Sequence, residues 1–525
     1  MGGRHWQVLA LLVCLPTLLP LGATLAALLR PDAALWAHLL DYVLPEVTVN
    51  TLWLLLGVGM ATALLGTALA ALVALCEFPG RHMFSWALLL PLAMPGYVLA
   101  IAFIGLFDYA GPLATVLRGH GIALPEIRSR GGVIAVLSLT LYPYVYLLAR
   151  QAFASQGLRA LEAGRALGMR PLTAFRRVAL PLARPWIAGG VLLVLMETLA
   201  DFGTVAAFNY DSFTTALYKA WFALFSLEAA LQIAAVMLLL VLALIGLEAR
   251  TRARQRYTAL GTAAARRLAL GRLRWLASAL CAAVLLLAFV LPVLQLGTLA
   301  APHLPELDRR YLGFAANSAG LGLAAAALTT LAALLLAQAA RAAPGALTGL
   351  GVRLATLGYA LPGALLAVGL YVPLARGVGL LNAQFGWTLA LQGGLALLLV
   401  AYGVRFMAVA HAPVAGGFLR IRPSMIEACR LLGVGRLTQA RQLYWPLLRG
   451  ALLTAMLLVF VDVMKEMPIT LMTRPFGWDT LATRVFELTS EGEHARAAVP
   501  ALGIVIAGLL PVWLLNRGAD RATAA

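Results

Sequence analysis

The chain is built largely from apolar runs, many of them about twenty residues long and so able to cross a lipid bilayer as a helix. Only 12% of its 525 residues are charged, which is about half the share that is usual in soluble proteins. The runs are continuously apolar, whereas the strands of a membrane barrel alternate apolar and polar residues. The sequence therefore predicts an all-α polytopic membrane protein and excludes an ordinary soluble enzyme.

We predict about twelve transmembrane helices from these runs. The first run is expected to be retained in the protein, because it exceeds the apolar core of a signal peptide and no clear small-residue cleavage site follows it. The predicted limits are 8–29, 50–76, 85–107, 132–153, 186–209, 226–248, 275–298, 315–340, 350–375, 386–410, 448–472 and 498–516.

The basic residues predict how these helices are oriented. The chain has 40 Lys and Arg against 22 Asp and Glu, and in membrane proteins such a surplus collects in cytoplasmic loops. An N-terminus in the cytoplasm places the arginine-rich loops on that side. These loops are 77–84, 154–185, 249–274, 341–349 and 411–447.

Six features of the first half recur in the second half at nearly constant spacing. The first two pairs share one separation along the chain, and the other four pairs share a separation that is shorter by two positions. The pairs are Asn50 and Asn317, Met94-Pro95-Gly96 and Leu361-Pro362-Gly363, Glu162 and Glu427, Gly168 and Gly433, Pro181 and Pro446, and Asp201 and Glu466.

This repetition predicts a tandem duplication of a six-helix unit. The first unit is residues 1–249 and the second is residues 275–525, with a basic cytoplasmic linker at 250–274 that contains eight Arg. Both copies start from the cytoplasm, so the repeat is parallel. Parallel repeats are related by an axis along the membrane normal, and transport pathways run between them.

The longest polar loop of each half contains the same pattern. The first loop has Glu162-Ala163-Gly164 and the second has Glu427-Ala428-Cys429, and in both a glycine follows six residues after the Glu and a proline nineteen residues after it. A Glu is favoured near a helix N-terminus, and a glycine suits the left-handed residue that ends a helix. Ser424 has the capping-box spacing to Glu427. Each loop is therefore predicted to hold a helix of about two turns.

The duplicated pattern resembles the cytoplasmic "EAA" loop of permease subunits in binding-protein-dependent ABC importers. The resemblance implies two tandem permease repeats in a bacterial inner membrane. It also implies two partners, a cytoplasmic ABC ATPase dimer and an extracytoplasmic solute-binding protein. In that family the loop helices are coupling helices that sit in grooves on the ATPase subunits. The residues that match this role are Glu162, Ala163, Gly168, Pro181, Glu427, Ala428, Gly433 and Pro446. The second copy departs from the family pattern at Cys429 and Trp445.

The chain lacks the sequence of an ATP site. Its two lysines, Lys219 and Lys465, lie outside any Gly-Lys-Ser/Thr phosphate-binding loop. We therefore expect a transporter subunit rather than an enzyme, with no catalytic residue and no bound cofactor, and with ATP used by a partner. The seven histidines and four cysteines show no metal-ligand spacing, so no metal site is expected.

Two acids follow each predicted coupling loop, inside a predicted span. They are Glu197 and Asp201 in the first half, and Asp462 and Glu466 in the second. Each pair is four residues apart and so shares one helix face, and charge inside a membrane is costly. The helices are expected to break at Gly203 and Pro468. The acids line a pathway that suits a cation, or they cap and clamp helices, with Glu466 paired to Lys465 or Arg474.

The substrate is indicated by a second resemblance. The stretches at 199–204 (Leu-Ala-Asp-Phe-Gly-Thr) and 210–216 (Tyr-Asp-Ser-Phe-Thr-Thr-Ala) resemble the iron(III) permease branch, which works with a periplasmic iron-binding protein. The resemblance implies inward movement of iron(III) by alternating access. The fused architecture also occurs in the thiamine branch, and small anions such as sulfate, phosphonates and molybdate are further candidates.

Two other classes of protein fit parts of the sequence. An ion-coupled secondary transporter would have the same span count and would use the buried acids for protons or sodium. A membrane scaffold without transport would need the polar helix faces only for packing. Neither class accounts for the duplicated Glu, Gly and Pro spacing.

Overall fold

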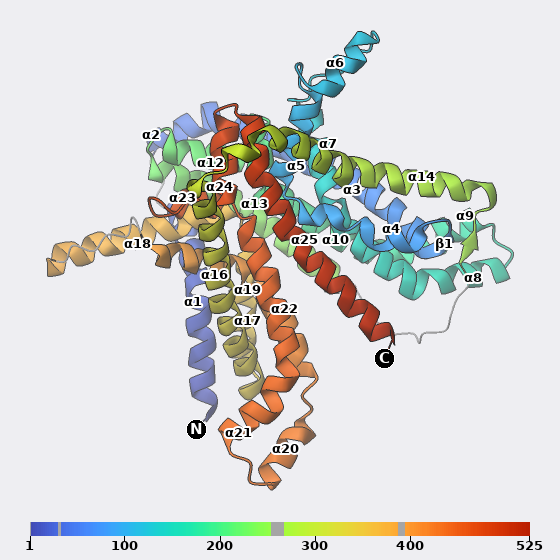
Figure 1. Cartoon of the computed structure of the whole chain (residues 1–525). Helices are drawn as coiled ribbons and strands as arrows, with labels where there is room; N and C mark the ends of the chain where they lie inside the picture. The colour runs from blue at the N-terminus through green and yellow to red at the C-terminus, as the bar shows by residue number, and fades with distance from the viewer. Residues whose placement is uncertain (1, 30–32, 254–266, 387–393, 525) are drawn as a thin grey trace. The chain divides into compact units, whose positions relative to one another are not determined.

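In the computed structural model, residues 2–29, 33–253, 267–386 and 394–524 are described. The first half of the chain contains α1 (Gly2–Leu28), α2 (Ala33–His38), η1 (Leu39–Val43), α3 (Leu44–Leu75), β1 (Cys76–Glu77), α4 (Arg81–Ala87), η2 (Leu90–Ala93), α5 (Gly96–Phe107), α6 (Pro112–Gly119), α7 (Arg130–Ala152), η3 (Phe153–Gly157), α8 (Leu158–Ala166), α9 (Pro171–Ala174), η4 (Phe175–Ala179), α10 (Leu180–Ala200), α11 (Gly203–Ala207), α12 (Phe213–Phe222) and α13 (Leu227–Ala253) (Figure 1). The η segments are short 3₁₀ or π turns.

The second half has a similar order of elements. It contains β2 (Leu268–Ala269), η5 (Gly271–Leu273), α14 (Arg274–Leu285), η6 (Leu286–Val290), α15 (Leu291–Ala300), η7 (Ala301–Glu306), α16 (Arg309–Ala342), α17 (Ala346–Leu357), η8 (Gly358–Ala360), α18 (Gly363–Phe385), α19 (Leu395–Leu419), α20 (Pro423–Leu431), α21 (Arg436–Gln439), η9 (Ala440–Tyr444), α22 (Trp445–Met464), α23 (Pro468–Thr473), α24 (Leu481–Ser490) and α25 (His494–Ala524).

The all-α membrane class is confirmed. Among the described residues, eleven helices are long and apolar enough to cross a membrane. A shorter apolar stretch, His494–Leu509, lies where the twelfth span is predicted. Roughly twelve spans therefore agree with the sequence, although their limits differ in several places.

Two of the predicted spans are wrong as continuous helices. The span predicted at 85–107 is divided into α4, η2 and α5, and the span predicted at 350–375 is divided into α17, η8 and α18. Pro95 and Pro362 stand at the N-caps of α5 and α18. Proline lacks the N–H that a continuing helix needs, and it pushes the preceding residue into extended backbone. Met94 and Leu361 adopt that extended conformation.

The contacts divide the chain into two compact units. Unit 1 comprises Met1–Leu35, Leu217–Leu238 and Leu307–Arg484, and unit 2 comprises Trp36–Ala216, Leu239–Glu306 and Val485–Ala525. In unit 1, α1 packs on α16, α17 and α18; in unit 2, α15 packs on α5 and α25. Helices from both sides of the linker thus build each unit. The boundaries 1–249, 250–274 and 275–525 follow the sequence repeat and stay a prediction.

The predicted linker lies mostly outside the described residues. Near the end of the linker, Leu268 and Ala269 form the short strand β2, which pairs in parallel with Cys76 and Glu77 of β1. Both strands belong to unit 2. The returning linker is therefore fixed beside the end of α3.

The core of unit 2 forms where α3, α7 and α10 approach closely. Val145 of α7 lies between two glycines, because a Cβ at Gly66 of α3 would stand 2.8 Å from its Cβ and a Cβ at Gly190 of α10 would stand 2.8 Å from its Cα. Small residues let membrane helices pack at short range. Buried Tyr142 donates from its hydroxyl to the Leu88 carbonyl at 2.9 Å, which ties α7 to the break before η2.

Replacing Gly190 by alanine is expected to destabilise unit 2. The added methyl would meet the Val145 backbone, and overpacking of this kind costs about 1–3 kcal/mol. Thermal unfolding of the purified protein in detergent measures the loss. Gly246→Ala on α13 is the matched control because a Cβ there meets nothing within 4 Å. Equal unfolding midpoints for the two variants would contradict the close packing.

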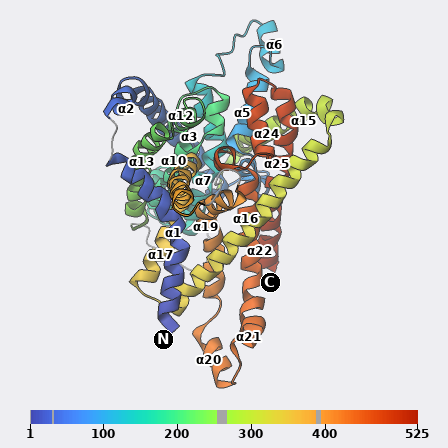
Figure 2. The same cartoon turned by 90° about the vertical axis from the view of Figure 1, so that its left-hand side faces the viewer.

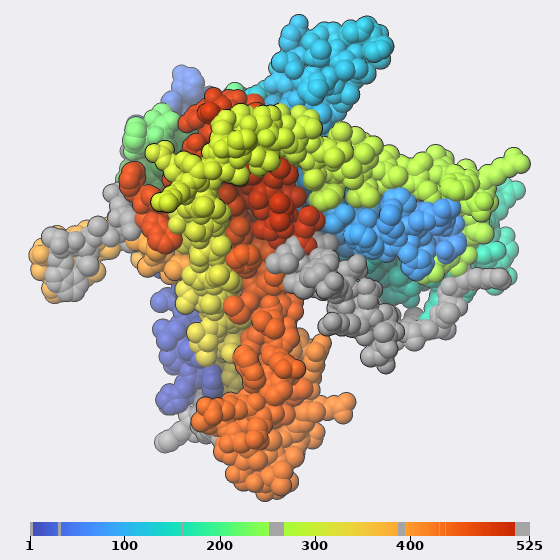
Figure 3. All heavy atoms as spheres, in the orientation of Figure 1, coloured from blue at the N-terminus to red at the C-terminus, as the bar shows by residue number. Residues whose placement is uncertain are grey.

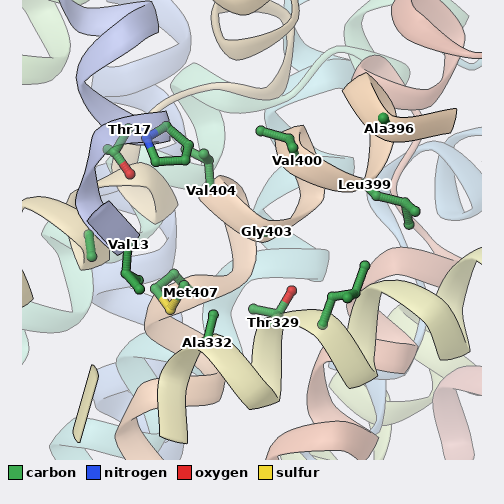
Figure 4. Close-up of a pocket in the computed structure, with 13 residues that line it drawn as sticks. Val13, Thr17, Thr329, Ala332, Ala396, Leu399, Val400, Gly403, Val404 and Met407 are labelled. Atoms are coloured by element: carbon green, nitrogen blue, oxygen red, sulfur yellow. The ribbon is translucent and has the colours of Figure 1, made fainter. Parts of the chain in front are cut away.

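Unit 1 contains an apolar cavity of about 400 Å³ between α1, α16, α17 and α19. Val13, Thr329, Val400 and Met407 are among its lining residues (Figure 4). Thr329 is buried and its hydroxyl has no hydrogen-bond partner among the described residues. None of the four acids predicted for a pathway lines this cavity.

Candidate coupling loops and buried acids

The first predicted coupling loop extends directly from a membrane helix. α7, η3 and α8 follow one another without a break from Arg130 to Ala166. The run ends at Gly168, whose φ of +79° is the left-handed conformation that favours glycine. α9 and η4 then lead without a break into α10, where Pro181 is the second residue and directly follows the π turn η4.

The second loop repeats this order at a constant offset along the chain. α20, α21, η9 and the start of α22 follow α8, α9, η4 and the start of α10 at the spacing that also separates Glu162 from Glu427. Gly433 has a φ of +66°, and Pro446 lies in the first turn of α22. The short helices and both left-handed glycines predicted from the sequence are confirmed. Figures 1 and 2 show α20 and α21 at the end of unit 1 where α1 begins.

The two loops differ at their starts. α19 ends at Leu419, so three residues separate it from α20, whereas α8 continues from α7 through η3. The predicted capping role of Ser424 is wrong, because α20 begins one residue earlier, at Pro423. Proline has its φ already set for the first helical position and displaces serine from the cap.

Both loops present acids and large apolar side chains to their surroundings. Glu162, Ala163, Glu427 and Ala428 are exposed. Two pairs of leucines at equivalent positions of the repeat are exposed as well: Leu167 and Leu432 by 78% and 80%, and Leu172 and Leu437 by 60% and 67%. Figure 3 shows the second loop on the surface of unit 1. The sequence reasoning missed these leucines, although their equal spacing was visible in the repeat.

Asp201 stands at a break between two helices of unit 2. α10 ends at Ala200 and α11 begins at Gly203, which confirms the predicted break. Oδ1 of Asp201 accepts from the backbone N–H groups of Thr204 and Val205, each at 3.1 Å, and Oδ2 accepts from the Thr204 hydroxyl at 2.8 Å. These are the contacts of a helix N-cap, so Asp201 caps α11.

Glu466 has the same arrangement in unit 1. α22 ends at Met464 and α23 begins at Pro468, again confirming the predicted break. The Glu466 carboxylate accepts from the backbone N–H of Ile469 at 3.0 Å and from the N–H and hydroxyl of Thr470 at 3.1 Å each. Tyr402 and Thr470 share a hydrogen bond of 2.6 Å between their hydroxyls. The buried carboxylate is therefore held by three donors from α23.

The repeated glycines explain how these caps fit. A Cβ at Gly363 would stand 2.8 Å from Oε1 of Glu466, and a Cβ at Gly96 would clash with the Thr204 hydroxyl. Each Pro-Gly break therefore packs against the acid-capped break of the same unit. The Pro-Gly motif and the acid-capped break lie far apart along the chain, yet they are in contact in both copies of the repeat.

The repeated asparagines fasten the segment that follows each short helix. Oδ1 of Asn50 on α3 accepts from the Tyr210 hydroxyl at 3.3 Å. Nδ2 of Asn317 on α16 donates to the carbonyls of Gly477 and Asp479, at 3.4 and 3.1 Å. Both asparagines lie inside their helices rather than at the starts of spans, since α3 begins at Leu44 and α16 at Arg309.

The other two acids are half-buried on α10 and α22. Glu197 lies one turn before Asp201, and Asp462 pairs with Lys465 at 2.9 Å. Arg474 forms an ion pair with Asp479. The predicted pairing of Glu466 with Lys465 or Arg474 is therefore wrong. Lys465 and Arg474 pair with Asp462 and Asp479 instead, and Glu466 accepts from N–H groups of α23. Within the described ranges, no cluster of three or more His, Cys, Asp or Glu is placed to hold a metal ion.

Comparison with known sequences relates the chain to transporter permeases. Residues 63–259 match the family model of the binding-protein-dependent transport system inner membrane component. This match covers the first loop and its flanking helices, and it confirms the resemblance read from the sequence. Residues 63–259 therefore match a binding-protein-dependent permease domain, and the chain is similar to an ABC-type permease over 90% of its length.

Its relatives include permeases for several solutes. The Fe(3+)-transport system permease protein FbpB 2 of Haemophilus influenzae is 25% identical over 90% of both chains. The sulfate transport system permease protein CysT of Salmonella typhimurium is 29% identical over 37% of this chain and 70% of its own. A probable molybdenum ABC transporter permease protein of Haloferax volcanii is 27% identical over 39% of this chain and 75% of its own. The likeness to the iron permease extends through both repeats.

Proposed function

We propose that this chain moves iron(III) inward across a bacterial inner membrane by alternating access, driven by a separate ATPase dimer. A loaded solute-binding protein docks on the outer face. ATP binding closes the ATPase subunits, and their motion passes through α8 and α20 to the membrane helices. The N-terminus and both loops lie in the cytoplasm. One chain supplies both permease halves, so no second permease subunit is needed.

The coupling proposal rests on one observation, the duplicated geometry of the loops. In each copy an exposed Glu, an exposed Leu and a left-handed glycine occupy the same positions of the same sequence of short helices. Large exposed apolar side chains rimmed by polar residues mark surfaces for a partner. Two equivalent surfaces suit the two equivalent subunits of an ATPase dimer.

The connection of α8 to the membrane helices suits transmission of movement. Because α7, η3 and α8 form one continuous helical run, a displacement of α8 moves α7 with it. α9 and η4 connect to α10 without a loop, and α10 ends at the Asp201 cap. The path from loop to break therefore contains only packed helical segments.

The exposed leucines distinguish ATPase docking from a helix that rests on lipid. Replacing both Leu167 and Leu432 by serine is expected to weaken the complex with the ATPase by at least about 30-fold, since each truncated interface anchor costs at least about 1 kcal/mol. Co-purification and titration of the detergent-solubilised subunits measure this loss. Leu224, which is 67% exposed and outside both loops, gives the control Leu224→Ser. Normal ATPase affinity in the double variant would favour the lipid surface.

Iron(III) is supported by the similarity of the whole chain to an iron permease. Asp201 and Glu466 are occupied with helix caps and Asp462 is paired with Lys465, so among the four acids proposed to line a pathway Glu197 is the one without such a role in the structure. Neither Glu197 with Asp201 nor Asp462 with Glu466 forms a strong metal-binding site. Transport requires that the ion be released again. An iron site that is weak within the permease is consistent with delivery by a binding protein.

A small oxyanion is the second candidate, since the sulfate and molybdenum permeases are similar over somewhat more than a third of the chain's length. Uptake of iron(III), sulfate and thiamine by cells from which the gene is deleted, and then restored, tests the substrate. Loss and recovery of iron uptake alone supports the proposal. Unchanged iron uptake, in a strain without a second iron system, removes iron and leaves the permease class intact.

A further inference from the structure

Unit 2 contains a basic pocket of about 610 Å³ at the end that carries α8. It lies where α3, α4, α7 and η3 meet the segment before β2. Leu158, the first residue of α8, is part of its wall. The polar residues that line the pocket are Arg81, Ser85, Arg150, Gln151, Ser155 and Arg267.

The pocket has a surplus of positive charge. Glu77 lies 3.4 Å from Nε of Arg81 and 3.9 Å from Nη1 of Arg267, and in the described part of the chain it is the carboxylate paired with these arginines. Arg150 donates to the Ser85 carbonyl, and its guanidinium stands 5.6 Å from the Tyr146 ring centre. Among the described residues, one carboxylate thus pairs with two of the three guanidinium groups, which leaves positive charge for an anion.

Arg81 adds buried positive charge to the wall of the pocket. This residue is only 8% exposed, and its Nε lies 3.4 Å from the Glu77 carboxylate in an ion pair without hydrogen-bond geometry. This Nε is enclosed, so an anion in the pocket acts on Arg81 through its charge rather than through a hydrogen bond to this atom.

The repeat shows that the fold does not require these arginines. Thr348 follows Arg81 by the same number of residues as Asn317 follows Asn50, so Thr348 is the equivalent of Arg81 in the second half. By the separation between Glu162 and Glu427, the equivalent of Arg150 is Ala415. The second half builds the corresponding helices α17 and α19 with these residues. The arginines are therefore specific to the first half, as expected of a binding site rather than of a packing need.

We propose that this pocket binds a phosphate group, supplied by the headgroup of an anionic phospholipid on the cytoplasmic side. Arginine presents paired donors that match phosphate oxygens, and basic pockets between membrane helices on this side recognise such headgroups. A lipid held here contacts the junction of α7 and α8, and so steadies the coupling helix. The lipid source, unlike the phosphate site, rests on the orientation given under the proposed function.

Binding is tested on the purified chain alone, without ATPase, binding protein or iron. Native mass spectrometry in detergent counts bound phosphatidylglycerol and, as a neutral-headgroup comparison, phosphatidylcholine. A thermal-shift titration with inorganic phosphate forms a separate arm. Wild type is compared with Arg150→Gln combined with Arg267→Gln, and with Arg353→Gln, an exposed arginine of α17 outside the pocket.

We expect the double variant to bind phosphatidylglycerol on the order of tenfold more weakly, since each arginine near the surface adds about 1 kcal/mol, while Arg353→Gln binds as wild type does. Stabilisation by inorganic phosphate but not by the lipid, lost in the double variant, retains the phosphate site and overturns the lipid source. The proposal is overturned if wild type, the double variant and Arg353→Gln all bind phosphatidylglycerol equally well and all bind inorganic phosphate equally well. It is also overturned by a double variant that binds phosphatidylglycerol as tightly as wild type does. A failure of iron transport leaves these results unaffected.

Discussion

A chain with both Glu162→Ala and Glu427→Ala is expected to lose most of its transport while remaining folded in the membrane. Both acids are exposed on equivalent short helices, so their removal leaves the packed core unchanged. Truncating a charged group that is buried in an interface costs about 2–5 kcal/mol. Two such losses lower the affinity for the ATPase dimer by at least about 100-fold, and uptake falls with it.

The matched control for this variant is Glu126→Ala, an exposed acid in the segment between α6 and α7. The measurements are substrate uptake, ATPase co-purification and the amount of protein in the membrane. Each single variant should lie between wild type and the double variant, because either copy alone engages one ATPase subunit. Transport at the wild-type rate in the double variant, with both acids absent, would end the coupling role of the loops.

The second large effect is expected at the capped breaks. Asp201→Ala and Glu466→Ala each remove a carboxylate that accepts three hydrogen bonds. A lost helix cap costs about 0.5–2 kcal/mol, and buried donors left unpaired add about 1–3 kcal/mol. We therefore expect each variant to unfold with a free energy about 2–3 kcal/mol lower than wild type. Thermal unfolding in detergent measures the change.

Asp201→Asn and Glu466→Gln separate the cap from a role in transport. In Asp201→Asn the carboxamide oxygen still accepts from both backbone N–H groups, because both bond to the same oxygen, Oδ1, so this variant should keep most of the stability that its alanine variant loses. In Glu466→Gln the two N–H groups bond to different oxygens, so the carboxamide keeps one of these hydrogen bonds and only part of that stability. If capping is the whole role, uptake in the amide variants stays within about twofold of wild type. A stable amide variant without uptake would instead assign the negative charge to the pathway.

The sequence predicted what depends on spacing along the chain. Apolar length indicated the membrane helices, and the nearly constant offset between the two halves indicated the repeated loops. Positive φ at Gly168 and Gly433, and the breaks after Asp201 and Glu466, follow from local backbone preferences. These features require no knowledge of which helix packs on which.

Features that depend on packing at long range could not be predicted. Hydropathy does not distinguish a broken span from a continuous one, so Pro95 and Pro362 indicated kinks but not the full division of each span into separate helices. The packing of α1 with helices of the second half, and of α15 with helices of the first, has no local sequence signal. The partner of Arg474 likewise depends on the turn that the chain makes after α23, whereas Lys465 pairs with Asp462 at the local i,i+3 spacing of a helix.

The most direct test of the central claim is uptake of radioactive iron(III) into proteoliposomes that contain this chain, its ATPase and its binding protein. We predict that uptake requires all three proteins and hydrolysable ATP on the ATPase side, and that a proton or sodium gradient without ATP gives none. Uptake driven by an ion gradient in vesicles that contain this chain alone would contradict the account, because the protein would then be a secondary transporter.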